Sequence, residues 1–171
     1  MTSLPDLPVT RILPQLDAAF ATHASAVLVA PPGAGKTTLV PLHFLNASWR
    51  GDGMIVLLEP RRLAARAAAR RMAQLLGEEP GETVGYRMRL ESKVSAKTKI
   101  LVVTEGVFAR MILDDPDLKG IAAVLFDEFT SVALMPILVW HWRWMCRPLC
   151  ATILKSSSCR QRWMVRVWPH S

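Results

Sequence analysis

Acidic residues are missing from the last quarter of this 171-residue sequence. All 14 aspartates and glutamates lie at or before Glu128, whereas six of the 21 lysines and arginines follow Thr130. The formal net charge of +7 therefore belongs mostly to the C-terminal stretch, and residues 1–129 are close to neutral. A basic balance suits a polyanionic partner, but in this chain it is mainly a property of the tail.

Cysteines and long apolar runs are also scarce. The three cysteines, Cys146, Cys150 and Cys159, form no CxxC pair, and no histidine lies at zinc-finger spacing from them. A metal site or a disulfide framework is not expected, and a reduced cytoplasmic protein is the default.

The longest apolar stretch, 132–140, is far shorter than the roughly 20 residues that span a bilayer. The N-terminus lacks the basic and then apolar order of a signal peptide, so we expect no membrane partner.

Short, wholly apolar runs alternate with helical patterns along the first 126 residues. Runs without polar alternation are typical of strands buried on both faces. The predicted strands are 26–30, 54–58, 83–88, 99–103 and 121–126, and the predicted helices are 9–20 (interrupted by Pro14), 36–45, 63–76 (ended by Gly77) and 105–113. This alternation predicts a three-layer α/β fold with a mostly parallel sheet.

The segment APPGAGKT (30–37) stands directly after the first predicted strand and before a helix, which is the context of a Walker A phosphate loop. Gly33 and Gly35 permit backbone conformations that let successive amides converge on phosphate oxygens. Lys36 would place its ammonium group on the β- and γ-phosphates and assist catalysis, and Thr37 would offer its hydroxyl to Mg²⁺. The predicted ATP-binding residues are Gly33, Ala34, Gly35, Lys36, Thr37 and Thr38.

Two acids, Asp127 and Glu128, follow the last predicted strand in IAAVLFDEF (121–129). Ligands of parallel sheets sit outside the carboxyl ends of the strands. Asp127 would hold Mg²⁺, partly through water, and Glu128 would be the catalytic general base that activates water. Such a pair is often only a solvated strand end, but with a phosphate loop upstream it predicts nucleotide hydrolysis.

Five segments in order resemble the motifs of bacterial DEAH-box ATP-dependent RNA helicases: APPGAGKT, EPRRLAARAAARRMA (59–73), VGYRMR (84–89), TEG (104–106) and LFDEF (125–129). The resemblance covers about residues 4–129. It implies the first RecA-like domain of a P-loop NTPase, which binds ATP against a second RecA-like domain and moves along RNA or another single-stranded nucleic acid.

The same resemblance assigns nucleic-acid contacts to two loops, and an arginine fork together with helix N-terminal amides suits phosphate. The alternative for the arginines of the first loop is a solvated first turn of helix. Arg66, Arg70 and Arg71 are interpreted as a solvated helix face. The predicted nucleic-acid-binding residues are Pro60, Arg61 and Arg62 in the first loop, and Thr104, Glu105 and Gly106 in the second.

The pattern departs from the family after residue 129. Thr130 stands where the histidine of the DEAH box is expected, and no Ser-Ala-Thr motif, second RecA-like domain or arginine finger follows. We expect a truncated helicase domain over 1–129 and a basic, Trp- and Cys-containing, poorly structured tail over 130–171. The tail can be back-translated into its possible codons and read in the frame that starts at the third base of each codon. In that frame, residues 129–133 permit His-Glu-Arg-Ser and residues 158–164 permit Met-Ser-Ala-Thr-Leu-Asp. Both match the family, so our hypothesis is a one-base deletion after the Phe129 codon.

Without the second domain and its arginine fingers, the chain is expected at most to bind nucleotide weakly and not to hydrolyse ATP appreciably. Two alternatives remain. One is a non-catalytic module that binds nucleotide or nucleic acid through its basic surface. The other is a P-loop kinase, against which the DEF and VVTEGV segments argue.

Overall fold

A seven-stranded sheet organises the part of the chain that the computed structural model describes, residues 7–127 and 162–167. The order across the sheet is β1-β7-β6-β2-β5-β3-β4. Neighbours from β6 to β3 are parallel, whereas β7 and the edge strand β4 run antiparallel to their neighbours. The strands are β1 (Ser25–Val29), β2 (Met54–Leu58), β3 (Val84–Met88), β4 (Glu91–Lys93), β5 (Ile100–Val103), β6 (Ile121–Phe126) and β7 (Arg162–Val167).

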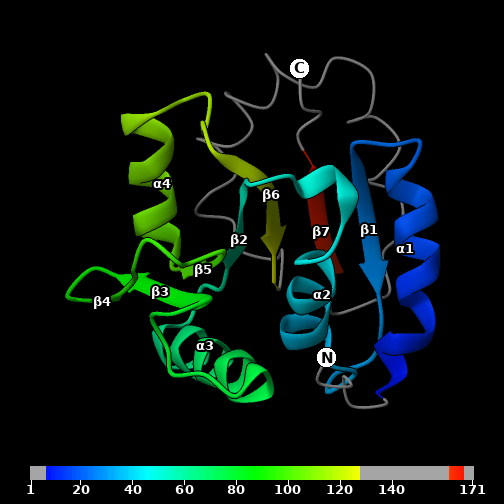
Figure 1. Cartoon of the computed structure of the whole chain (residues 1–171), viewed down its shortest axis with the longest axis horizontal. Helices are drawn as coiled ribbons and strands as arrows, with labels where there is room; N and C mark the ends of the chain where they lie inside the picture. Colours follow the sequence, from blue (N-terminus) through cyan, green and yellow to red (C-terminus); the bar gives the residue numbers. More distant parts are fainter. Residues whose placement is uncertain (1–6, 128–161, 168–171) are drawn as a thin grey trace.

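Helices cover both faces of the sheet and give the three layers that the sequence predicts (Figure 1). One face carries α1, α2 and α3, and the other carries α4. The mostly parallel α/β architecture is therefore confirmed. The helices are η1 (Pro8–Ile12), α1 (Leu13–Phe20), α2 (Lys36–Phe44), η2 (Ser48–Arg50), α3 (Arg62–Leu76) and α4 (Glu105–Asp114).

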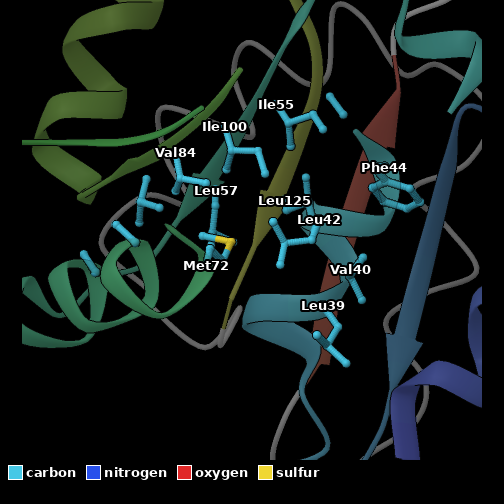
Figure 2. Packing of buried hydrophobic residues seen from close by; sticks show 14 of the residues in the cluster. Leu39, Val40, Leu42, Phe44, Ile55, Leu57, Met72, Val84, Ile100 and Leu125 are labelled. Carbon is cyan, nitrogen blue, oxygen red and sulfur yellow. The ribbon is translucent and has the colours of Figure 1, made fainter. Parts of the chain in front are cut away.

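The larger core lies between the central strands and helices α2 and α3 (Figure 2). Leu57 of β2 and Leu125 of β6 are fully buried and belong to the same cluster as Leu39 of α2 and Met72 of α3. Burying each such side chain stabilises the fold by roughly 1.5–3 kcal/mol. This packing sets the position of the first turns of α2 and α3 relative to the strand ends.

A smaller core holds α4 against the opposite face of the sheet. Phe108 of α4 packs edge-on against Phe126 of β6, with 6.0 Å between the ring centroids. Ile112, one turn further along the helix, joins the same cluster. The start of α4 is thereby fixed beside the ends of β5 and β6.

Most predicted elements agree with the structure to within two residues, and three expectations need correction. The single helix predicted over 9–20 is two elements, the 3-10 helix η1 and then α1, and Pro14 lies in the first turn of α1, where the missing proline N–H is unneeded. Strand β1 is buried on one face only, since Val27 and Val29 are 37% and 49% exposed on the other. The third concerns Arg66, one of the arginines that we expected on a solvated helix face.

Arg66 is half-buried and forms an ion pair with Glu91 of β4. The Tyr86 hydroxyl group donates a hydrogen bond to the same carboxylate, at 2.5 Å from Oε1. This hydrogen bond and, after it, the ion pair with Arg66 lower the pKa of Glu91. Arg70 and Arg71 are exposed as expected. This cluster of Arg66, Tyr86 and Glu91 connects α3 to the β3–β4 hairpin. The spacing of residues along the helix does not reveal that the two elements are in contact.

Strands β4 and β7 were not predicted, and β7 lies within the stretch 130–171 that was expected to be poorly structured. Strand β4 is short and polar, and β7 lies between β1 and β6, pairing with both (Figure 1). Because β1 and β6 each run antiparallel to β7, they are parallel to one another. The phosphate loop after β1 and Asp127 after β6 therefore leave the sheet at the same edge.

Replacing Leu57 with alanine tests the core that holds α2 and α3. Leu57→Ala should lower the free energy of unfolding by about 2–5 kcal/mol, because it removes buried methyl groups and leaves a cavity. The matched control is Leu113→Ala on α4, where the side chain is 73% exposed and the expected change is within about 0.5 kcal/mol. Urea unfolding followed by circular dichroism measures both, and equal losses would contradict the placement of Leu57.

Candidate functional site

The loop between β1 and α2 has the backbone shape that the sequence requires of it. Gly33 and Gly35 adopt φ values of +73° and +89°, in the left-handed region that favours glycine. A Cβ atom on Gly35 would also lie 2.7 Å from Cδ1 of Leu7. Gly35 is the N-cap of α2, so the N–H groups of the first helical turn point toward the loop. These features suit an anion at the start of α2.

The Lys36 side chain is buried within its own loop. Its Nζ donates hydrogen bonds to the carbonyl oxygens of Ala30 at 2.6 Å and Pro31 at 2.9 Å. The loop is joined to η1 by the Val9 N–H, which donates to the Ala34 carbonyl oxygen at 3.1 Å. The ammonium group is thus held at the loop by two neutral carbonyl groups, which an anionic ligand can replace.

Thr37 and Asp127 are in direct contact although 90 residues separate them in the chain. The Thr37 hydroxyl group donates a hydrogen bond to Oδ2 of Asp127 at 2.6 Å. Asp127 is itself anchored, because its N–H donates to the Leu58 carbonyl oxygen of β2 at 3.0 Å. The structure therefore brings the phosphate loop and the acid after β6 together, as the sequence predicts.

The two side-chain oxygens suit Mg²⁺ in kind, because this ion prefers hydroxyl, carboxylate, phosphate and water oxygens. No cluster of three or more His, Cys, Asp or Glu residues that could hold a metal ion occurs within residues 7–127. Thr37 and Asp127 would supply only part of an octahedral shell, so phosphate oxygens and water would have to complete it. This is the usual composition of a magnesium–nucleotide site.

The two predicted nucleic-acid loops lie at the same edge of the sheet. Arg61 is the N-cap of α3 after β2, and Thr104 is the N-cap of α4 after β5. The Arg61 side chain is 64% exposed, and Arg62 and Gly106 are also exposed. Pro60 and Glu105 are half-buried, as is Thr104. Glu128, the predicted general base, lies outside the described residues.

Sequence reasoning missed Glu59, which follows β2 as Asp127 follows β6. Glu59 is only 2% exposed and lies beside Asp127, because the preceding residues Leu58 and Phe126 are paired between the parallel strands β2 and β6. Its Oε1 accepts the Arg61 N–H at 3.3 Å and lies 3.6 Å from Arg61 Nε. Burial, and then the charge of Asp127, raise the pKa of Glu59 from 4.5 to about 7. An acid directly after a wholly apolar strand was the available signal.

The family model described as DEAD/DEAH box helicase matches residues 11–156. Among curated proteins, the ATP-dependent RNA helicase HrpB of Escherichia coli strain K12 is 52% identical over 128 residues, which cover 75% of this chain and 16% of that protein. The ATP-dependent RNA helicase DHX33 of Drosophila melanogaster is 39% identical over 118 residues, covering 69% of this chain and 16% of its own. The chain therefore spans about a sixth of the length of these relatives.

Solved structures share the fold as well as the sequence. A crystal structure of Escherichia coli DEAH/RHA helicase HrpB matches with a TM-score of 0.74 at 46% identity, covering 81% of this chain and 18% of that one. A structure of the E. coli DExH-box NTPase HrpB matches with a TM-score of 0.72 at 44% identity, and the match covers 86% of this chain and 19% of that one. The α/β fold is thus that of a helicase RecA-like domain.

None of the helices within residues 7–127 combines the length and apolar character that crossing a bilayer requires.

Proposed function

Because the chain belongs to the DEAD/DEAH box helicase family, we propose that it carries the ATP-binding face of an ATP-dependent RNA helicase that acts in the cytoplasm. The observation that carries this proposal is the 2.6 Å contact between Thr37 and Asp127. A glycine-rich turn with a solvated lysine would not need an acid from another strand at the first turn of the following helix. A site for a cation and a triphosphate needs both groups in one place.

In this proposal the amides of residues 33–38 bind the phosphates, and Lys36 neutralises their charge. Its ammonium group exchanges the carbonyl oxygens of Ala30 and Pro31 for phosphate oxygens. Thr37 and Asp127 hold Mg²⁺, which when bound neutralises charge on the β- and γ-phosphates. Glu128 is proposed as the base that activates water, as the family resemblance implies.

The nucleic-acid site is proposed at the loops that precede α3 and α4. Arg61 and Arg62 are exposed beside the N-terminus of α3, and Thr104, Glu105 and Gly106 form the start of α4. Arginine side chains and helix N-terminal amides bind phosphate groups without reading bases. Contacts of this kind suit a single-stranded RNA that slides past the domain.

We further propose that residues 130–171 are translated out of frame and that the helicase sequence proper ends near Phe129. The proposal is supported by the loss of acidic residues after Glu128 and by the gain of tryptophan and cysteine after residue 139. In the shifted frame the coding DNA should encode His-Glu-Arg-Ser after Phe129 and Ser-Ala-Thr opposite residues 158–164. Sequencing the gene through this region decides the matter, and codons incompatible with those residues would refute the deletion.

Replacing Lys36 with alanine tests the proposed nucleotide site. Lys36→Ala should weaken binding of a fluorescent ATP analogue at least about tenfold, the equivalent of one charge-assisted hydrogen bond. Binding of single-stranded RNA in the absence of nucleotide should persist, because the proposed RNA loops are separate from Lys36.

The exposed Lys97 provides the control, and Lys97→Ala should leave nucleotide binding unchanged. Unaltered nucleotide binding by Lys36→Ala would contradict the assignment. RNA binding that disappears when residues 130–171 are removed, and only then, would favour a non-catalytic basic module.

A further inference from the structure

Glu59 is a buried acid that stands between the two proposed sites. It directly follows β2, and its N–H donates to the Val103 carbonyl oxygen of β5 at 3.0 Å. Its main chain is therefore tied to the sheet at the point where both strands end. Any adjustment of the Glu59 contacts must be made by the side chain.

The contacts of the Glu59 carboxyl group extend in two directions. On one side it interacts with the carboxyl group of Asp127, which follows the neighbouring strand β6 and also accepts the Thr37 hydroxyl group at 2.6 Å. On the other side its Oε1 accepts the Arg61 N–H at 3.3 Å and lies 3.6 Å from Arg61 Nε. A continuous line of polar contacts thus joins the first turn of α2 to the residue that caps α3.

A packing role does not explain an acid at this position. Removing a carboxyl group from water is unfavourable unless its charge is balanced. The neighbours balance it poorly, since Asp127 has charge of the same sign and the Arg61 guanidinium group belongs to a side chain that is 64% exposed. A leucine or methionine would fill the same space without this penalty. The polar contacts of Glu59 therefore explain the presence of an acid at this position better than packing does.

We propose that Glu59 is a positioning residue that couples the nucleotide site to the first nucleic-acid loop, because one carboxyl group holds both Asp127 and Arg61. The proposal rests on the function proposed above. The main chain of Asp127 is fixed by its hydrogen bond to Leu58. When its carboxylate turns toward a bound cation, the contact with Glu59 changes. The Glu59 carboxyl group then redistributes its contacts toward Arg61, and the guanidinium group shifts relative to a bound nucleic-acid phosphate.

The experiment measures binding of fluorescein-labelled oligouridine to the whole chain by anisotropy, with and without saturating Mg²⁺ and AMP-PNP. The two affinities of the wild-type chain should differ about fivefold or more, as coupled sites typically do. In Glu59→Leu, which fills the space but loses both contacts, both ligands should still bind and the ratio should fall to about one. Glu59→Gln should restore the wild-type ratio, because its amide can donate to Asp127 and accept from Arg61.

Glu91→Gln is the matched control. It removes a carboxylate that is paired with Arg66 of α3, the helix that Arg61 caps, and it should keep the wild-type ratio. If circular dichroism finds Glu59→Leu unfolded, Glu59→Met makes the same test with a more adaptable side chain. A wild-type ratio of about one, or an unchanged ratio in Glu59→Leu, overturns the coupling and leaves the proposed function standing. A wild-type chain that binds neither ligand overturns the proposed function and the coupling with it.

Discussion

The hydrogen bond between Thr37 and Asp127 is the contact on which the account of this chain depends. It exists only if α2 packs on the sheet with its N-terminus at the carboxyl ends of the strands and if β1 is parallel to β6. The Leu39 and Leu125 core provides the first condition, and the strand order provides the second. Packing in the apolar core therefore sets the distance between a hydroxyl group and a carboxylate that together suit a cation.

Acids directly after buried strands give this edge of the sheet its chemistry. Asp127 after β6 and Glu59 after β2 are adjacent because their strands are parallel neighbours. Helices α3 and α4 begin at the same edge, after β2 and β5, and add exposed arginines and helix N-termini. A proposed site for a triphosphate and one for a nucleic-acid backbone thus share one row of strand ends, with Glu59 touching members of both.

Much of this arrangement was predictable from the sequence, and the exceptions have physical reasons. The runs 54–58 and 121–126 were bounded to the residue because strands buried in a parallel sheet are continuously apolar. Strand β4 escaped prediction because it is short, polar and at the edge of the sheet, and therefore has no apolar run. The ion pair of Arg66 with Glu91 escaped because its partners are 25 residues apart. The exposure of Val29 depends on what covers that face of the sheet, which no local pattern reports. Glu59 was overlooked although the matched segment 59–73 begins with it, because its burial and its position beside Asp127 depend on the parallel pairing of β2 with β6.

The magnesium dependence of ATP binding tests the central claim most directly. Isothermal titration calorimetry of the wild-type chain, Thr37→Val and Asp127→Asn would be run in excess Mg²⁺ and again in EDTA. If the two oxygens hold the cation, Mg²⁺ will strengthen ATP binding to the wild-type chain and do little for either variant, while all three bind alike in EDTA. The same enhancement by Mg²⁺ in all three proteins would contradict the account.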